Sequence, residues 1–374
     1  MLLFLFPLLL APCAGSEEGA PTPTVTASPA PTATAASGEG ETAGLDLPST
    51  CRQQEGGRFT YVNYTAGYCL QYPASFHVGD VLPEGAPNVE NILGLYGPAY
   101  DDSLEPLRAG MSIVVVGPAE GRTLQQVVEE AVVSAGSEAE IARRPARLGG
   151  EAAVILDGMP GRTENRKVLA IHEDTVYEVT VYPTGDEFPE VAGDVALVWQ
   201  AVLSSFTFLS EDVLEQFAPC PEEASPYADV AAGYCLRYPS SLRLFRSADP
   251  AAVTIADAPL AAGDGEETAR ATMTIEMVLV SPERSLQALV DGIVANFPEA
   301  EVQQRQVELG GKEAIVIEGL PGRMENRQLF VRHGDALYRL TLSPAGDEFQ
   351  GATAAAEGLW EAVTESFTFL PAAD

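Results

Sequence analysis

The sequence predicts an α+β protein made of two tandem copies of one unit, each an antiparallel sheet with helices packed on it. Three observations predict this class. Segments of the chain recur in matched order, each copy contains capped amphipathic helices, and each contains strands that alternate apolar and polar residues. A chain of 374 residues also suits two domains of about 150 residues each better than a single core.

The amino terminus, MLLFLFPLLLAPC, predicts a secretory leader over residues 1–13. Its apolar run is too short to span a bilayer and fits the apolar part of a signal peptide. LAPC resembles a bacterial lipobox, in which Cys13 would be lipidated, although no basic residue precedes Leu2 and Pro12 replaces the usual small residue. The alternative is an ordinary secretory signal that is cleaved further on.

Residues 14–50 are almost entirely Ala, Pro, Thr, Ser, Gly and Glu. They contain too few large apolar groups to compensate for the loss of conformational entropy on folding, so we expect a disordered tether. A lipidated cysteine followed by this tether would anchor the folded part to a membrane from outside the cytoplasm. We therefore expect an extracytoplasmic lipoprotein of the cell envelope.

The repeat defines two domains, 51–212 and 213–374. AGYCLQYPASF returns as AGYCLRYPSSL, VWQAVLSSFTFL returns as LWEAVTESFTFL, and the block 148–167 shares eleven of its twenty residues with 309–328. A duplication explains this matched order. We expect each copy to enclose its own apolar interior.

Each copy predicts the same elements in order. TLQQVVEEAVVSAG begins at Thr123 with a Thr-x-x-Gln capping box and continues with apolar residues at helical spacing, and its counterpart begins at Ser285. TVYEVTVYP at 175–183 and ALYRLTLSP at 336–344 alternate as strands. A second helix is expected from Asp186 and from Asp347, carrying Trp199 or Trp360 inward, and SFTFL closes each copy as a short strand.

The order YCLxYPxSF, capped helix, LxGxxAxxI, xxYxLTxxP and helix ending in SFTF resembles the PsbP and Mog-type fold, an α/β/α sandwich, and its bacterial envelope lipoprotein relatives. The match covers nearly all of each copy, although its motifs are mostly core spacings. Members of this group are extrinsic photosystem subunits, a binder of the nuclear transport GTPase Ran, and envelope lipoproteins. The resemblance implies a protein-interaction function with no shared catalytic site.

Four further cysteines lie near the starts of the two copies: Cys51, Cys69, Cys220 and Cys235. They allow three connectivities, and duplication of the pair favours Cys51–Cys69 with Cys220–Cys235. Such pairing requires an oxidising compartment, in agreement with the leader. We expect no zinc site, because the sequence has no C-x₂-C spacing and no neighbouring histidine cluster.

The nonapeptide GMPGRTENR at 158–166 returns as GLPGRMENR at 319–327. Its proline and glycine fit a type II turn, in which Gly161 would supply the positive φ. After the turn, a continuing strand would place alternate residues on one face as an ion ladder. The alternative is a binding site in which two arginines attract a carboxylate or phosphate, with an asparagine nearby. The candidate residues are Arg162, Glu164, Asn165, Arg166, Arg323, Glu325, Asn326 and Arg327.

The three histidines predict no site. His172 and His333 occupy equivalent positions at expected hairpin tips, where an exposed turn histidine is the simple interpretation, and His77 has no counterpart. A metal ligand or general base would need convergent partners, and none is evident. No motif for a hydrolase nucleophile, a nucleotide phosphate, zinc or calcium is present.

We expect no nucleic-acid partner, because the formal charge of −33 gives an acidic surface that repels phosphate backbones. We therefore expect a non-catalytic, cofactor-free lipoprotein whose tandem domains bind a protein partner or support a membrane complex. The alternative is a solute-binding module for a small anionic or metal ligand. A hydrolase whose site escapes motif analysis is the third hypothesis.

Overall fold

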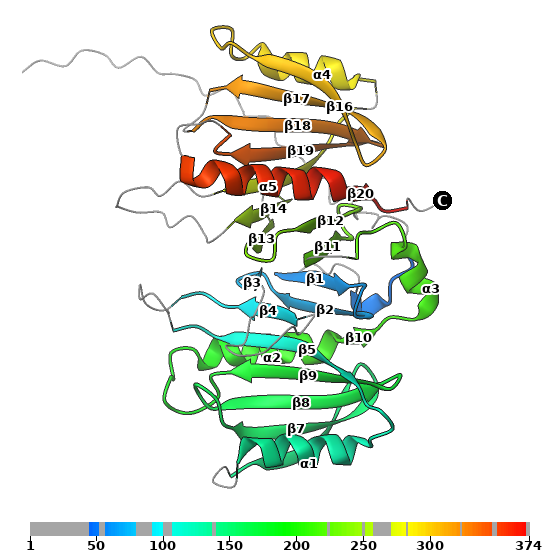
Figure 1. The fold of residues 1–374 in the computed structure, drawn as a ribbon, viewed down its shortest axis with the longest axis vertical. Helices are drawn as coiled ribbons and strands as arrows, with labels where there is room; N and C mark the ends of the chain where they lie inside the picture. Colours follow the sequence, from blue (N-terminus) through cyan, green and yellow to red (C-terminus); the bar gives the residue numbers. More distant parts are fainter. Residues whose placement is uncertain are drawn as a thin grey trace, which may run out of the picture. The chain divides into compact units, whose positions relative to one another are not determined.

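A computed structural model describes residues 45–51, 57–79, 92–99, 107–136, 140–222, 225–248, 251–256, 271–281, 283–321, 324–345 and 350–371. The predicted leader and the predicted lipidation site, Cys13, lie outside these residues. All described residues belong to one compact unit, Gly40–Asp374. Its fold is α+β and dominated by sheet, and every strand pairing in it is antiparallel (Figure 1).

The elements of the first half run in the order that the sequence predicts, with a helix between two groups of strands and a second helix before the last strand. They are the 3₁₀ helix Ser49–Cys51, β1 Arg58–Asn63, β2 Tyr68–Pro73, β3 His77–Gly79, β4 Ile92–Tyr96, β5 Gly110–Pro118, α1 Leu124–Ala135, β6 Ala142–Leu148, β7 Glu151–Met159, β8 Asn165–His172, β9 Thr175–Tyr182, α2 Ala192–Ser205 and β10 Thr207–Phe208.

The second half follows after a short helical connection and repeats this order. Its elements are α3 Glu211–Leu214, the 3₁₀ helix Glu215–Phe217, β11 Ser225–Asp229, β12 Tyr234–Tyr238, β13 Arg243–Ala248, β14 Ala251–Ala256, β15 Thr272–Leu279, α4 Leu286–Val294, β16 Gln303–Leu309, β17 Lys312–Leu320, β18 Asn326–His333, β19 Ala336–Ser343, α5 Gln350–Ser366 and β20 Thr368–Phe369.

The predicted helix starts are confirmed for the first helix of each half. Thr123 caps α1 with a complete capping box to Gln126, and Ser285 accepts the amide hydrogen of Ala288 at the start of α4. The second helix begins later than predicted. α2 starts at Ala192 rather than Asp186, because Pro189 and the turns around it occupy the intervening segment. Asp347 lies outside the described residues.

Helices cover both faces of the long sheet. On β8, Val168 and Ala170 belong to the main core, whereas Leu169 between them packs with α1. Because alternate side chains of a strand point to opposite faces, α1 lies on the face opposite to α2. The second half repeats this arrangement, with Leu329 in the main core and Phe330 packed with α4.

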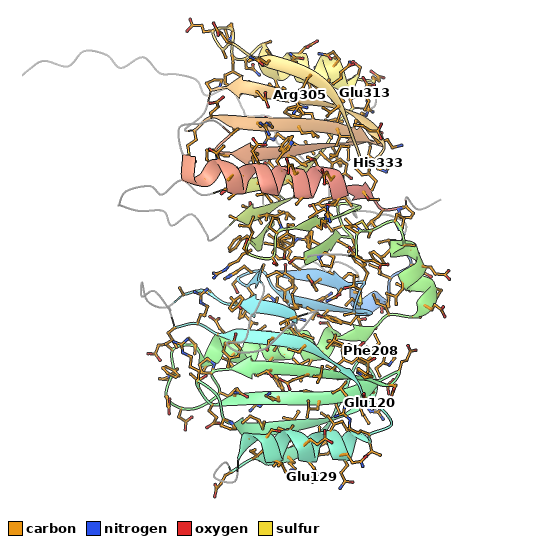
Figure 2. All side chains as sticks on the ribbon, in the orientation of Figure 1. Glu120, Glu129, Phe208, Arg305, Glu313 and His333 are labelled. Carbon is orange, nitrogen blue, oxygen red and sulfur yellow. A yellow bond between two sulfur atoms is a disulfide. The ribbon has the colours of Figure 1, made fainter. Side chains whose placement is uncertain are left out.

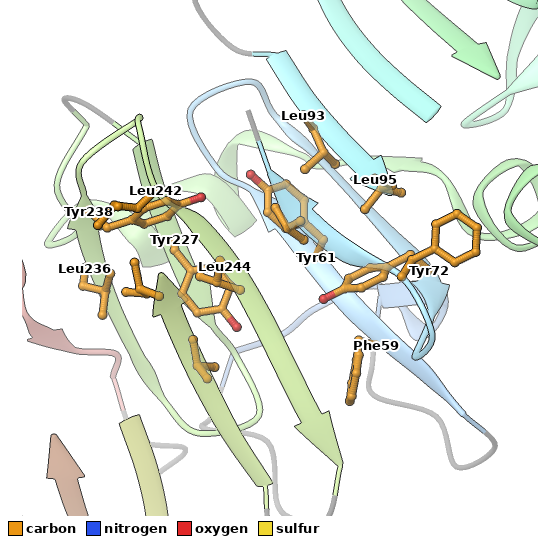
Figure 3. Close-up of a cluster of buried hydrophobic side chains, with 14 of the residues drawn as sticks. Phe59, Tyr61, Tyr72, Leu93, Leu95, Tyr227, Leu236, Tyr238, Leu242 and Leu244 are labelled. Atoms are coloured by element: carbon orange, nitrogen blue, oxygen red, sulfur yellow. The ribbon is translucent and has the colours of Figure 1, made fainter. Parts of the chain in front are cut away.

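The expectation of two separate interiors is wrong. Fourteen strands form one sheet in the order β16-β17-β18-β19-β15-β14-β13-β3-β4-β5-β9-β8-β7-β6. The two halves meet where β3 pairs with β13 through Val78 and Leu244. One apolar cluster includes Tyr72 of the first half and Tyr227 of the second (Figure 3). The short strands β3 and β13 leave edges that pair with each other, so the apolar layer beneath them is continuous.

A second apolar cluster corrects the expected end of the tether. Leu45 and Leu47 are 5% and 2% exposed and pack with Val62, Tyr64 and Phe217. Residues 49 and 50 of the expected tether begin the 3₁₀ helix Ser49–Cys51, and residues 14–44 lie outside the described residues. The two leucines are the sequence feature that could have predicted this burial, because each adds apolar area that folding can bury in an otherwise polar segment.

Candidate interaction sites

The repeated nonapeptide begins with a β-bulge. Gly158 and Gly319 have φ of 80° and 84°, and the strand register shifts at both positions. A Cβ on Gly158 would lie 2.7 Å from the carbonyl oxygen of Glu140, and one on Gly319 would lie 2.5 Å from that of Glu301. The type II turn predicted for the first nonapeptide is wrong, because Gly161 does not have the positive φ that such a turn requires. Gly322, on which the second turn depends, lies outside the described residues. The motif needs its first glycine for the bulge.

The last arginine of each nonapeptide is partly buried and bonds carboxylates of the chain itself. Arg327 donates from Nε to Glu318 at 2.6 Å and from its two terminal nitrogens to Glu357 at 3.0 Å each. Its guanidinium lies 5.0 Å from the ring centroid of Trp360. Arg166 repeats this contact at 5.1 Å from Trp199 and pairs with Asp157. These arginines therefore join a helix to the sheet, and their donors are directed at internal carboxylates.

The expected ion ladder is also wrong, because β8 begins only at Asn165. Arg162 and Glu164 are exposed and precede the strand, and the carboxylate partner of Arg166 is Asp157 on β7. In the second copy Glu325 likewise precedes β18, and Arg323 lies outside the described residues. The period-two pattern did not reveal that the strand starts one residue after Glu164.

The two asparagines hold the loop that precedes each strand. The side-chain amide of Asn165 donates to the carbonyl of Pro160, and that of Asn326 donates to the carbonyls of Leu320 and Met324, each at 3.5 Å. The anion-site interpretation required the arginines and these amides to face an external ligand together. Internal partners instead occupy Arg166, Arg327 and both asparagines.

The hairpin histidines are packed rather than exposed. His172 and His333 lie at the β8–β9 and β18–β19 turns, as predicted. His172 stacks on Phe208 with ring centroids 3.9 Å apart, and His333 stacks on Phe369 at 4.2 Å. Burial, with a contribution from the charge of Lys312, lowers the pKa of His333. The simple interpretation as exposed turn residues is wrong because SFTFL places an aromatic ring beside each turn.

Both predicted disulfides are confirmed. Cys51 bonds Cys69 and Cys220 bonds Cys235, each with a Cα–Cα distance of 5.8 Å. All four cysteines lie in the apolar cluster that contains Leu45 and Leu47. The bonds therefore join a residue that precedes the first strand of each half to its second strand, β2 or β12, and they are consistent with an oxidising environment.

A buried ion pair lies where the two halves meet, and sequence analysis missed it. Arg246 donates to both carboxylate oxygens of Asp229 at 3.1 Å, and the two side chains are only 9% and 4% exposed. The same guanidinium donates to the carbonyl of Thr60 in the first half at 3.3 Å and lies 4.9 Å from the ring centroid of Phe59. Asp229 occupies the position of Asn63 in the first copy. This difference in charge is the sequence feature that could have indicated a charged partner for Asp229.

His77 lies at the same junction, between the rings of Tyr96 and Phe245. Burial, together with the positive charges of Arg108 and Arg243, lowers its pKa to about 4. Its Nε2 has no hydrogen-bond partner among the described residues. His77 is therefore neutral near pH 7, and its absence from the second copy agrees with a role at the junction alone.

The described part of the chain has hollows at two places far apart in the sequence. One of about 70 Å³ lies beside Asp229, Tyr234 and Arg246, well below the roughly 300–1,000 Å³ typical of small-molecule sites. The other, about 370 Å³, is a shallow surface depression at Phe297–Ala300 and Pro321. In the whole described part of the chain, no group of three His, Cys, Asp or Glu side chains is placed to hold a metal ion. No described helix is long and apolar enough to cross a membrane.

The two outer strands of the long sheet, β6 and β16, differ in chemistry. Both are exposed over most of their length, and within the described residues no strand pairs with their outer edges. β6 reads ARRPARL and β16 reads QQRQVEL, so Pro145 of the first copy corresponds to Gln306 of the second. Proline and cationic side chains are features that block strand addition at a sheet edge. β16 lacks the proline and retains one arginine, so it is the open edge.

The fold and these sites define a sheet-dominated α+β protein with two disulfides. No family model and no curated protein matches the chain. Among solved structures it is similar to cyanobacterial PsbP (CyanoP) from Synechocystis sp. PCC 6803, with 16% identity over 39% of this chain and 91% of that chain, at a TM-score of 0.27.

Proposed function

We propose that this chain is a non-catalytic extracytoplasmic lipoprotein, anchored to a membrane through Cys13, whose folded part binds a protein partner. The proposal treats 51–212 and 213–374 as PsbP/Mog-like domains that arose by duplication. The matched order of elements in the two halves supports this. The two disulfides support an oxidising compartment.

One observation carries the interaction proposal, the open edge of β16. A strand at the end of a sheet presents unpaired N–H and C=O groups, and partner proteins use such edges by adding a strand of their own. β6, at the other end of the same sheet, contains Pro145 and Arg143, Arg144 and Arg147. Within the described residues, the long sheet is therefore closed at its β6 edge and open to strand addition at its β16 edge. No observation on the described residues favours the alternative of a small anionic or metal ligand.

Site-specific cross-linking tests the interaction. A photoreactive phenylalanine analogue replaces Gln306 in one variant and Pro145 in a matched control, both in the membrane-anchored full chain. We expect irradiation of intact membranes to give a discrete heavier product from position 306 and none from position 145. Equal labelling at both positions, or none at position 306, would refute the proposed surface.

The anchor is tested separately by fractionation. Replacing Cys13 by Ala removes the only thiol that the expected lipidation can use, so the chain should move from the membrane fraction to the soluble extracytoplasmic fraction. The parent chain should remain in the membrane fraction and partition into detergent. Retention of the variant on membranes would contradict anchoring through Cys13.

A further inference from the structure

The register of the β16–β17 hairpin identifies which backbone groups face outward. Leu309 pairs with Lys312 across a two-residue turn in which Gly310 and Gly311 have φ of 57° and 72°. In such a hairpin the residues next to the turn form a hydrogen-bonded pair, and the pairs then alternate along the ladder. Gln304, Gln306 and Glu308 therefore direct their N–H and C=O groups away from β17. They can hydrogen-bond three alternate positions of an added strand.

In the first copy, the equivalent strand β6 is blocked against strand addition. Its equivalent hairpin also pairs Leu148 with Glu151 across two glycines, so the outward positions are Arg143, Pro145 and Arg147 by the same alternation. Pro145 has no N–H to donate at the middle of this edge. At the equivalent position of β16, Gln306 keeps its donor and its acceptor.

Two carboxylates face each other at the open edge. Glu308 on β16 is the cross-strand partner of Glu313 on β17, and both side chains are exposed. Like charges directly opposite each other destabilise a sheet, and neither carboxylate has a cationic partner among the described residues. A positive side chain placed beside this pair would relieve the repulsion. The equivalent pair in the first copy is Arg147 with Ala152, which contains no such repulsion.

The net charge of the surrounding segment is also more negative at the β16 edge than at the β6 edge. Residues 299–313 contain four acids (Glu299, Glu301, Glu308, Glu313) and two bases (Arg305, Lys312), a net charge of −2. The equivalent residues 138–152 contain three acids and three bases, a net charge of 0. Figure 2 shows Arg305 and Glu313 on the β16–β17 hairpin. The open edge is therefore also the more acidic one.

We propose that β16 receives an extended, positively charged segment of a partner protein as an added strand, with a Lys or Arg side chain beside Glu308 and Glu313. This inference rests on the proposed interaction function and specifies its surface and its partner chemistry. A second copy of the chain fits less well, because it carries the same charge of −33 and would bring further carboxylates to the edge.

Peptide binding to the purified full chain tests the inference. The probes are two fluorescent nine-residue peptides, one alternating Lys with Val and one alternating Glu with Val, titrated by fluorescence anisotropy. We expect the Lys peptide to bind at least tenfold more tightly than the Glu peptide, with an affinity that falls as salt rises. Equal affinities would overturn the charge assignment, and absence of Lys-peptide binding would overturn the inference.

Variants locate the binding to the edge. Gln306→Pro removes the central outward donor at a position where the first copy already has proline, and should weaken Lys-peptide binding at least tenfold. Glu308→Gln with Glu313→Gln should remove most of the preference for Lys over Glu. Arg147→Gln, on the other edge, is the control and should change neither. Circular dichroism melting checks that Gln306→Pro still folds. If it does not, the test depends on whether the double glutamate variant loses the preference for Lys over Glu.

Two further outcomes separate this inference from the proposed function. A cross-link from position 306 that an excess of the Lys peptide leaves unchanged would keep the partner-binding function and reject a cationic segment at the edge. Sedimentation of the chain without peptide provides the other: a dimer that Gln306→Pro dissociates would assign the edge to a second copy. Binding of the Lys peptide without any cross-link in membranes would leave the edge chemistry standing and contradict the proposed function.

Discussion

The guanidinium of Arg327 lies 5.0 Å from the ring centroid of Trp360 while its nitrogens bond carboxylates of β17 and α5. The equivalent Arg166 contacts Trp199 in the same way. This relationship explains why the nonapeptide ends in arginine in both halves. The arginine attaches the helix to the sheet, with a cation–π contact on one side and ion pairs on the other.

Replacing Arg327 by Gln should lower the free energy of unfolding by about 2 kcal/mol, because the variant loses the ring contact and leaves Glu318 and Glu357 without their cation. Arg166→Gln should cost about 1 kcal/mol, since Arg144 still pairs with Asp157. Arg162→Gln is the exposed control and should stay within about 0.5 kcal/mol. Urea denaturation measures all three, and an equal effect of Arg162→Gln and Arg327→Gln would contradict this assignment.

His77 should make the protein less stable in acid. Its pKa is about 4 in the folded chain against 6.5 when unperturbed, so between these values the unfolded chain binds a proton that the folded chain does not. Stability should therefore fall as pH drops from about 6.5 to 4, by about 3 kcal/mol in total. The loss should be complete below pH 4 and absent above pH 7.

The measurement compares the parent with His77→Gln at pH 7 and at pH 4 by urea denaturation. Carboxylates common to both chains cancel in the difference, so the parent should lose about 3 kcal/mol more than the variant between the two pH values. Parallel pH profiles for the two chains would show that His77 does not titrate in this way.

The buried pair of Arg246 and Asp229 should show strong coupling. Arg246→Met leaves the Asp229 carboxylate buried without a cation and should cost about 3–5 kcal/mol. Asp229→Asn keeps an oxygen for the turn amides of Ala231 and Ala232, as Asn63 does for Ala66, but leaves the arginine buried without an anion. Its cost should be of similar size. The double variant should be more stable than the sum of the single effects predicts, by about 2 kcal/mol.

A double-mutant cycle in denaturant measures this coupling. Arg246→Met also loses the contacts with Thr60 and Phe59 of the first half, and the cycle separates that loss from the coupling with Asp229. The coupling energy should persist at high salt, because a buried pair is screened much less than an exposed one. A coupling energy near zero would mean that the two charges do not stabilise each other.

The bulge glycines should resist substitution. Gly319→Ala places a Cβ 2.5 Å from the carbonyl oxygen of Glu301 at a φ of 84°, so we expect a loss of about 2 kcal/mol or more. Gly292→Ala in α4 is the matched control, because a Cβ there meets nothing within 4 Å. It should stabilise the chain by about 0.5–1 kcal/mol. Thermal unfolding orders the variants, and a neutral Gly319→Ala would contradict the bulge geometry.

Interactions between near neighbours in the chain were sufficient to predict most helices and strands and the cysteine pairing. Thr123 and Ser285 start helices because their side chains satisfy free amide hydrogens, an interaction between neighbours in the chain. The alternation at Tyr177 and Tyr338 predicts strands for a similar local reason. Recurrence of Cys51–Cys69 as Cys220–Cys235 was enough to choose between connectivities, since both bonds close short loops.

The tertiary structure decided which residues meet across the chain. Arg166 bonds Asp157 rather than Glu164, and Arg246 of the second half reaches the backbone of the first, because sheet register and the β3–β13 junction set those distances. The sequence also did not reveal that the two halves share one apolar layer, since strand edges carry no side-chain signature of their partner. The contrast between Pro145 and Gln306 was visible from the start. Only the strand order showed that both residues lie on free edges of the same sheet.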